Sequence, residues 1–374
     1  MNANRLVLPP PGGPYRVGTQ ALHLIDPTRA DPWQTGRRRE LMVQLWYPAA
    51  LCTQDTEPSA RYLTPSVADH VLEMWAEEGE KFGPALRDAL AGTRVHATHG
   101  APAASGPLRP LVLLSPGLGE YRTGLTALAE ELVSHGFVVA SVDHPSDAAG
   151  VEFPDGSAVP HREPEGLEDG DTSDLETRYL ASRVADLRFV LDRLLDHGSP
   201  WRMLLDPARI GIAGHSLGGA AAAELARLDA RPAAIAVLDG SLFGRVLSTG
   251  LDLPVLLCAL TLPDPDDPDV LAGWGQLWPL LRGPRRHTTV RGAGHMSATD
   301  FDILAGPLGL RDPGEDSGFG TLPPGRGIAL VREALAMFFE EHLMDRPAQR
   351  SLSGFPELST ETAPHTSGTV KPSH

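Results

Sequence analysis

The stretch RIGIAGHSLGGAAAAELARL, residues 209–228, sets a serine among glycines between an apolar run and an alanine-rich run. Gly214, Ser216 and Gly218 fit the pattern G-x-S-x-G, in which a sharp turn between a buried strand and a helix presents a serine hydroxyl. Glycines relieve the clashes that such a turn creates. The pattern alone is common by chance, and a close crossing of a strand and a helix is the plain alternative. The apolar run before Ser216 and the small residues after it favour a nucleophile.

The base that would activate this serine is expected on a later loop, because in folds with such an elbow the acid and then the histidine follow the serine. His295 stands in GAGHMS, just past the last apolar run, where a loop returns to the carboxyl edge of a parallel sheet. The other histidines after Ser216 start a run, belong to the last helical pattern or lie in the tail: His287, His342, His365 and His374. The sequence therefore predicts His295 as the base.

The acid has two candidates. Asp239 ends the run AAIAVLDG and would project from the same sheet edge as Ser216. Asp264 belongs to PDPDDPD, after the next run, which is the commoner place for the acid in such folds. The spacing of that cluster is typical of a solvated loop, whereas a carboxylate held at a strand end orients an imidazole better. Position alone leaves both residues open.

The elements that must position these residues alternate between two patterns. Short apolar runs predict strands at residues 21–26, 41–48, 109–117, 137–145, 209–216, 233–240, 254–260 and 287–295. From the third run on, most are separated by helical patterns at residues 123–136, 176–198 and 217–228, and another follows at 325–343. We therefore predict an α/β fold with a mostly parallel sheet of about eight strands and helices on both faces.

The organisation of the chain favours one domain over residues 1–345. Three stretches interrupt the alternation and are predicted to be insertions near the site: residues 49–108, 146–175 and 296–325. After residue 345 the composition turns to Ser, Thr, Pro and Gly, so residues 346–374 are expected to form a disordered tail.

The charge of the chain excludes some classes of partner. The formal net charge is -16 and the pI is near 5.3, so the chain repels nucleic acid. No stretch approaches the roughly 18 apolar residues of a membrane span, and the first residues lack the apolar core of a signal peptide. We expect no stable membrane insertion and a cytoplasmic location, unless a secretory leader has been removed. Of the two cysteines, Cys52 and Cys258, the second is expected to be a buried free thiol.

Several segments resemble the plasma-type platelet-activating-factor acetylhydrolases and their bacterial relatives, serine esterases of the α/β-hydrolase fold. GPYRVGTQALHLID with LMVQLWYP resembles the family's N-terminal segment, LLSPGLGEYRTGLTALAEELVSHGFVVASVDHP its oxyanion strand, helix and next strand, and GIAGHSLGGAAA its elbow. The similarity covers most of residues 13–345 and is patchy in the insertions. It implies that Asp239 is the acid, because in that family the acid ends the strand after the nucleophile's helix.

An oxyanion hole needs two backbone N–H groups aimed where negative charge develops. One is expected from Leu217, directly after the nucleophile. The resemblance assigns the second to Leu118, in the turn SPGLGEY. The family often has histidine where this chain has Pro116, and because a backbone N–H is the donor, we expect that change to keep the hole.

These residues predict a serine carboxylic-ester hydrolase that works through an acyl-enzyme. The resemblance implies short acyl chains, with the sn-2 acetyl group of a phospholipid as one substrate. A cutinase- or lipase-type hydrolase of polyesters or triglycerides is the alternative, since it shares GHS-x-GG and a similar SPG turn, although an acid at Asp239 argues against it. A non-catalytic binding protein on the same scaffold is a third hypothesis, which would require the loss of at least one part of the site.

Large apolar side chains in or beside the insertions are candidates for an acyl pocket, although such residues are more often ordinary core. They are Phe153, Trp274, Trp278 and Met296. No cofactor and no metal site are expected, because neither His135 with His144 nor the cluster PDPDDPD has a convincing ligand spacing. The sequence gives neither the acyl and alcohol groups, the mobility of a lid, nor the oligomeric state.

Overall fold

The computed structural model describes residues 6–50, 59–76, 81–162, 172–261, 271–311, 318–346 and 352–363. Within these ranges, one central sheet has the strand order β13-β12-β11-β10-β9-β5-β6-β2-β1-β4-β3. Its strands are β1 (Arg16–Ala30), β2 (Arg38–Ala49), β3 (Ser59–Arg61), β4 (Arg94–His99), β5 (Arg109–Ser115), β6 (Val138–Val142), β9 (Leu205–His215), β10 (Pro232–Leu238), β11 (Val255–Ala259), β12 (Arg285–Val290) and β13 (Leu358–Ala363). All the predicted strands are present, as β1, β2, β5, β6 and β9 to β12.

The middle of this sheet is parallel. Strands β5, β6, β9, β10, β11 and β12 pair in parallel, while β2 is antiparallel to both β1 and β6. Parallel strands bring their carboxyl ends to one edge, where Ser216 follows β9 and Asp239 follows β10. The predicted α/β fold with a mostly parallel sheet is confirmed.

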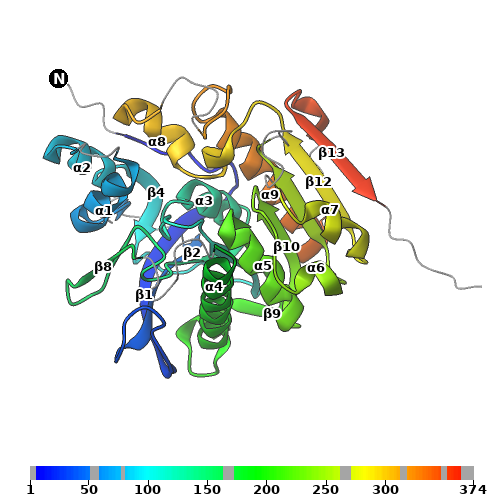
Figure 1. The fold of residues 1–374 in the computed structure, drawn as a ribbon, viewed down its shortest axis with the longest axis horizontal. Helices are drawn as coiled ribbons and strands as arrows, with labels where there is room; N and C mark the ends of the chain where they lie inside the picture. Colours follow the sequence, from blue (N-terminus) through cyan, green and yellow to red (C-terminus); the bar gives the residue numbers. More distant parts are fainter. Residues whose placement is uncertain are drawn as a thin grey trace, which may run out of the picture.

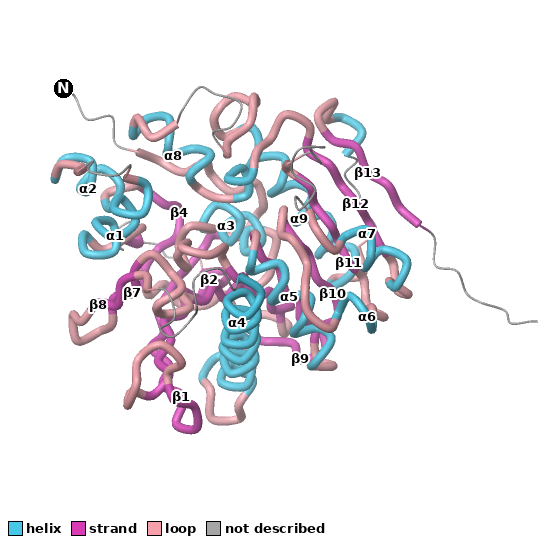
Figure 2. Tube along the Cα trace, viewed as in Figure 1, coloured by secondary structure: helices cyan, strands magenta, loops and turns pink. Residues whose placement is uncertain are grey.

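Helices cover both faces of the sheet. They are α1 (Pro65–Trp75), α2 (Pro84–Ala91), α3 (Thr126–Ser134), α4 (Thr172–Leu195), α5 (Leu217–Leu228), α6 (Val246–Thr249), α7 (Trp274–Leu277), α8 (Phe301–Leu308) and α9 (Arg326–Leu343). Side chains alternate along each strand, so Leu111 and Leu113 of β5 pack in one core with α4 and α5, whereas Val112 and Leu114 pack in the other with α3 and α9. Figure 2 shows α4 and α5 in front of the strands.

The predicted insertions carry elements of their own. Residues 49–108 include β3, β4, α1 and α2, and residues 146–175 include the hairpin of β7 (Gly150–Glu152) and β8 (Ala158–Pro160). In residues 296–325, α8 packs in one hydrophobic cluster with α1 through residues such as Val71 and Phe301. Figure 1 shows α1, α2 and α8 together at one end of the molecule. The first and third insertions therefore pack together through one hydrophobic cluster.

The C-terminal segment differs from the expectation. Leu358–Ala363 form β13, antiparallel to β12, with Leu358 opposite Val290 and the hydroxyls of Thr288 and Thr360 3.2 Å apart. Threonine suits a pleated surface, and β12 would otherwise leave its backbone groups unpaired at a sheet edge. The prediction of a tail without structure is wrong for these residues, while 364–374 lie outside the described residues.

Candidate active site

Ser216 lies at a strained turn between β9 and α5. Its backbone has φ 52° and ψ -126°, a conformation that a residue with a side chain adopts only when its surroundings enforce it. A Cβ at Gly214 would lie 2.1 Å from the carbonyl of Gly218, and one at Gly218 would lie 1.9 Å from the carbonyl oxygen of Ser115. Both glycines are therefore required by close backbone packing, and the turn has the geometry of a nucleophile elbow.

Asp239 and His295 meet beside this turn. Nδ1 of His295 lies 2.8 Å from Oδ2 of Asp239. Ser216 is tied to the same place, because its N–H donates to the carbonyl of Leu238 at 2.9 Å. The Asp239 side chain is 1% exposed and the His295 side chain 40%. With Nδ1–H donated to the carboxylate, Nε2 of His295 is the basic nitrogen.

The carboxylate of Asp239 is fixed by the end of β11. Oδ1 accepts the N–H groups of Leu260 and Thr261 at 2.6 and 2.8 Å, and Oδ2 accepts the Thr261 hydroxyl at 2.7 Å. Burial raises the pKa of Asp239, but the hydrogen bond and charge of His295 and the bonds from Thr261 hold that pKa below its usual value. No local pattern in the sequence marks Thr261 as a partner of the acid. The other candidate acid, Asp264, lies outside the described residues.

The turn that contains Leu118 is held by Arg183 of α4. The Arg183 guanidinium donates to the carbonyl oxygens of Pro116 and Gly117, the second at 2.9 Å, and pairs with Asp147. In a trans peptide the C=O and N–H point in opposite directions. Because the Gly117 carbonyl points to Arg183, the Leu118 N–H points away from it. Neither this N–H nor that of Leu217 donates to an acceptor in the described part of the chain.

Glu120 of the same turn pairs with His215, the last residue of β9. Glu120 accepts the Gly117 N–H at 2.6 Å and contacts Nδ1 of His215 at 2.5 Å. His215 is the variable residue before the serine in G-x-S-x-G, and nothing in the local pattern signals its partner 95 positions away. Its ring lies 4.5 Å from that of His295 between centroids.

Another serine, histidine and aspartate are hydrogen-bonded to one another at the end of β5, directly before the turn of Leu118. Nε2 of His144 is 3.1 Å from the hydroxyl of Ser115, and Nδ1 is 3.0 Å from Oδ2 of Asp186. We call these three residues the buried triad, because their exposed fractions are 0%, 2% and 0% for Ser115, His144 and Asp186. Asp186 also pairs with Arg39 at 2.7 Å and Arg29 at 2.8 Å. Because Ser115 is fully buried among the described residues, a substrate has no access to its hydroxyl. We therefore assign this arrangement a structural role.

The side chains predicted to line an acyl pocket are spread over the molecule. Phe153 is buried in a cluster with Met42, and Trp278 packs with Arg285 and partly against the main core. Trp274 is buried, and its indole N–H donates to the Gly240 carbonyl at 2.7 Å, next to Asp239. Met296 directly follows His295 and packs in the cluster of α1 and α8. Of the four, Met296 lies next to a predicted triad residue; a pocket lined by all four stays a prediction.

The end of α1 presents apolar surface to the turn SPGLGEY, residues 115–121, which we call the oxyanion turn. Met74 and Leu118 are exposed by 44% and 47%. A Cβ at Gly119 would lie 2.3 Å from the terminal methyl carbon of Met74, so this side chain covers the turn. The neighbouring Trp75 stacks on Phe301 with ring centroids 4.5 Å apart. Met74 and Trp75 of the first insertion and Phe301 of the third thus place apolar side chains beside Leu118, and no local pattern in the sequence marks them.

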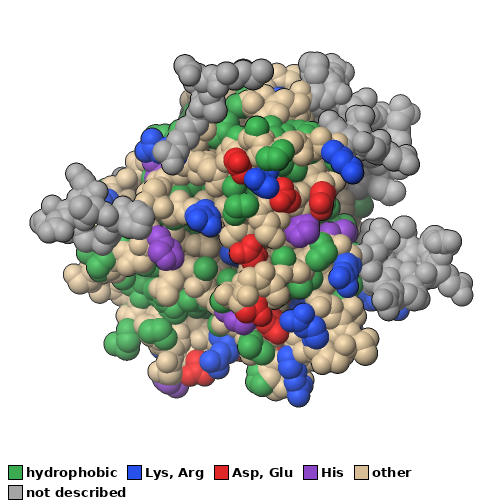
Figure 3. Space-filling view, turned by 90° about the vertical axis from the view of Figure 1, so that its left-hand side faces the viewer, with side chains coloured by type: hydrophobic (Ala, Val, Ile, Leu, Met, Phe, Trp, Pro, Cys, Tyr) green, Lys and Arg blue, Asp and Glu red, His purple; other side chains and the backbone are tan. Residues whose placement is uncertain are grey.

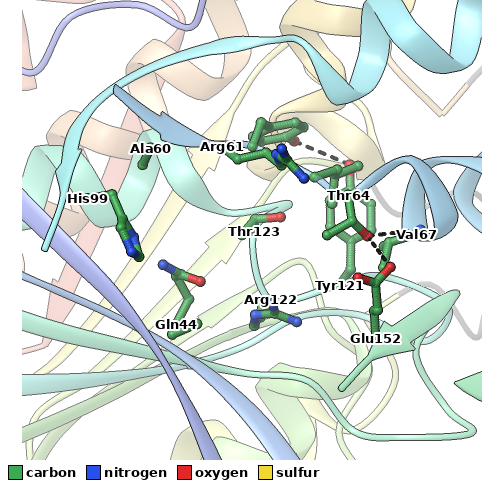
Figure 4. Close-up of a pocket in the computed structure, with 13 residues that line it drawn as sticks. Gln44, Ala60, Arg61, Thr64, Val67, His99, Tyr121, Arg122, Thr123 and Glu152 are labelled. Atoms are coloured by element: carbon green, nitrogen blue, oxygen red, sulfur yellow. Dashed lines mark hydrogen bonds between the residues drawn. The ribbon is translucent and has the colours of Figure 1, made fainter. Parts of the chain in front are cut away.

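A separate cavity of about 170 Å³ borders the segment after the turn (Figure 4). Its lining includes Gln44, Arg61, Tyr121 and Glu152, and contains none of the predicted site residues. Among the described residues, no group of three His, Cys, Asp or Glu side chains is arranged to hold a metal ion.

Comparisons with known proteins agree with this geometry. A family model described as platelet-activating factor acetylhydrolase, isoform II, matches residues 2–174. The solved structure of a ferulic acid esterase from Streptomyces cinnamoneus superposes with a TM-score of 0.80 and is 37% identical, over 95% of this chain and 99% of that one. The chain is therefore related to this bacterial esterase over almost its whole length, and residues 2–174 match the platelet-activating-factor acetylhydrolase family.

The relatives named for acetylhydrolase activity are less similar in sequence than this esterase. A probable 1-alkyl-2-acetylglycerophosphocholine esterase from Arthroderma benhamiae is 28% identical over 370 residues, which cover 91% of this chain and 89% of the relative. The platelet-activating factor acetylhydrolase of Cavia porcellus is 27% identical over 253 residues, or 60% of this chain and 53% of the relative. The protein is therefore a serine carboxylic-ester hydrolase of the α/β-hydrolase fold, as the sequence predicts.

Proposed function

We propose that the protein cleaves short-chain acyl esters through an acyl-enzyme on Ser216. The bond of 2.8 Å between His295 and Asp239 beside the strained elbow carries this proposal. Ser216 Oγ attacks the ester carbonyl while its proton passes to Nε2 of His295. The imidazolium then gives that proton to the leaving alcohol, and a water molecule releases the acid by the same route. Asp239 orients the ring and stabilises its positive charge.

The oxyanion of each tetrahedral intermediate would lie between the N–H groups of Leu118 and Leu217. Leu217 is the first residue of α5, so its N–H has no acceptor within the helix and lies at the positive end of the helix dipole. The Leu118 N–H is aimed by the bonds of Arg183 to the preceding carbonyls. Preorganised donors of this kind stabilise charge at the moment it forms.

The substrate class is set by the surface beside the turn. Acetyl and other short acyl esters are favoured by the names of the curated relatives. A hydroxycinnamoyl ester, such as a ferulate, is a second candidate, because the exposed side chains of Met74 and Leu118 and the stacked ring of Trp75 offer apolar surface to an aromatic acyl group, and the solved structure described above is a ferulic acid esterase.

A panel of substrates separates these candidates. We expect p-nitrophenyl esters to be cleaved fastest at short acyl lengths, since each buried methylene adds only about 0.8 kcal/mol and the pocket has an end. A phospholipid with a short sn-2 chain and methyl ferulate are run beside them. A ferulate kcat/KM above that of every aliphatic ester would replace the short-acyl proposal with the aromatic one.

The same panel tests the lipase alternative. Within the described ranges, no helix is long and apolar enough to cross a bilayer. On the face in Figure 3, Lys and Arg side chains stand among acidic, polar and apolar ones. With a net charge of -16, the chain is repelled by anionic surfaces. We expect no jump in rate when substrate passes its critical micelle concentration; a large rise on a triglyceride emulsion would favour the lipase.

A further inference from the structure

A continuous chain of hydrogen bonds joins the oxyanion turn to the loop of His295. The Gly117 N–H donates to Oε2 of Glu120 at 2.6 Å, and Oε1 of Glu120 lies 2.5 Å from Nδ1 of His215. Nε2 of His215 lies 2.8 Å from the carbonyl oxygen of His295. The two loops are far apart in sequence and come from opposite sides of the elbow, so this chain is a direct link between them.

The partners of His215 determine its charge. A carboxylate and a backbone carbonyl accept hydrogen bonds and have no proton to give, so both ring nitrogens of His215 must carry protons. The ring is then an imidazolium paired with the Glu120 carboxylate. The His215 side chain is fully enclosed and that of Glu120 is 13% exposed. A buried charge is tolerated only with a well-placed partner, which Glu120 supplies.

The surroundings favour this charged pair. Burial lowers the pKa of His215, but Glu120 first, then Asp239 and the His295 carbonyl, raise it above its ordinary value. Burial raises the pKa of Glu120, but His215, the Gly117 N–H and His295 bring it below its ordinary value. A Cβ at Gly117 would lie 2.8 Å from Oε1 of Glu120 and 3.2 Å from Nδ1 of His215, so the turn is packed directly on the pair.

We propose that Glu120 and protonated His215 are positioning residues that hold the oxyanion turn and the His295 loop at a fixed separation. The proposal rests on the proposed function, in which the Leu118 N–H binds the carbonyl oxygen of the ester and His295 transfers a proton to the leaving oxygen on the same carbon. A separation wrong by about 1 Å can cost 10²-fold in rate, so a rigid link between donor and base has a direct effect on catalysis. Neither residue touches the substrate.

Glu120→Gln tests the pair with little change of shape. The amide oxygen can still accept the Gly117 N–H, but the NH2 group then faces Nδ1 of His215, so the charged Glu120–His215 pair is lost. We expect kcat to fall by about 10- to 100-fold, the range that small misplacements produce, with KM changed less than about twofold. His215 should also lose its proton at lower pH, so the alkaline limb of kcat/KM moves to lower pH. Wild-type kcat with an unmoved alkaline limb would overturn the proposal.

Glu130→Gln is the matched control. Glu130 is a buried carboxylate on α3 that accepts the N–H groups of His96 and Ala97 at 2.9 and 2.6 Å, away from the site. Its replacement should lower thermal stability and leave kcat unchanged. An equal loss of kcat in Glu130→Gln and Glu120→Gln would mean that stability alone explains the effect, and would overturn the positioning role.

Two further measurements keep the outcomes separate. A fluorophosphonate should label Glu120→Gln to completion at a lower rate and should not label Ser216→Ala. Labelling of Ser216→Ala would refute the proposed function, whereas fast labelling and turnover of Glu120→Gln refutes the positioning pair alone. If Glu120→Gln does not fold, ¹⁵N shifts of the histidine rings in the unaltered protein decide: a neutral His215 at pH 7 refutes the proposal.

Discussion

A histidine–aspartate hydrogen bond occurs both in the predicted site of Ser216, Asp239 and His295 and in the buried triad of Ser115, His144 and Asp186, but the two groups differ in exposure and in the backbone conformation of the serine. Their histidine–aspartate distances are 2.8 and 3.0 Å. Yet the His295 side chain is 40% exposed and the His144 side chain 2%. Ser216 stands on a strained turn, whereas Ser115 ends the regular strand β5. Distance alone therefore does not make a triad catalytic.

The charge around each aspartate teaches more. Asp186 pairs with Arg39 and Arg29, so its negative charge is already matched. The other partners of Asp239 are neutral: the N–H groups of Leu260 and Thr261 and the Thr261 hydroxyl. The charge of Asp239 is thus left to stabilise an imidazolium. At His144, burial and then the positive charge of Arg183 lower the pKa, while Asp186 acts in the opposite direction. The lowered pKa favours the neutral form of the ring.

The largest expected contrast is between the two serines. Ser216→Ala should abolish fluorophosphonate labelling and reduce ester turnover by roughly 10⁶, as loss of a triad serine does. Ser115→Ala should keep full labelling, because its hydroxyl is enclosed. Circular dichroism checks that both variants fold. Labelling that persists in folded Ser216→Ala would place the nucleophile elsewhere.

The two aspartates should fail in different ways. Asp239→Asn is expected to lower kcat by roughly 10⁴ at nearly unchanged stability, since the imidazolium loses its partner. Asp186→Asn removes one of the two buried carboxylates that pair with Arg39, Asp31 being the other, and should cost about 3 kcal/mol of unfolding free energy, with labelling retained in the folded fraction. Turnover and urea unfolding measure both. If Asp264→Asn rather than Asp239→Asn abolishes turnover, the acid follows β11.

Arg183 connects the two regions, because it binds the oxyanion turn and lies next to His144. Arg183→Lys keeps the charge but cannot reach both carbonyls and Asp147 together. We expect kcat to fall by roughly 10²-fold with little change in KM, as for a weakened oxyanion hole. Steady-state kinetics on p-nitrophenyl acetate would show it, and an unchanged kcat would contradict the role of Arg183 in aiming Leu118.

The smallest expected effects are on the pH dependence of stability, with opposite signs. The pKa of His144 is lowered, so the unfolded chain takes up a proton near pH 6.5 that the folded protein refuses, and stability falls as the pH drops through about 6.5. The pKa of His215 is raised, so its contribution is present below about pH 6.5 and is lost as the pH rises through the raised value.

Urea unfolding at a series of pH values separates these contributions by difference from the unaltered protein. His144→Gln should flatten the loss on the acid side, and Glu120→Gln the loss on the alkaline side. Parallel curves for all three proteins would show that neither histidine has the charge assigned to it.

The parts of the fold that could be predicted are those written in local patterns. Buried parallel strands read as apolar runs, so each strand from β9 to β12 was visible in the sequence. The strands β3, β4 and β13 were not, because short strands with polar faces, at or next to a sheet edge, resemble loops. In β13, the threonines of Leu358–Ala363 stand in a segment whose composition otherwise suggests disorder.

The site shows the same division. Ser216 was predicted from its flanking glycines, and His295 from its place after the last strand. Arg183 and Glu120 were not, because their partners Gly117 and His215 are 66 and 95 positions away. A helical arginine and a turn glutamate are ordinary surface residues until the fold buries them. Contacts of this kind follow from tertiary packing and have no local signal.

The hydrogen bonds from Thr261 to Asp239 have a consequence for the evolution of the triad acid. The acid at the end of β10 is held from the end of β11, where many enzymes of this fold carry it, and the Thr261 hydroxyl lies 2.7 Å from the carboxylate. The two strand ends at which this fold can carry its acid are thus joined by hydrogen bonds. A chain with carboxylates at both strand ends would keep an acid for its histidine while one of the two is replaced.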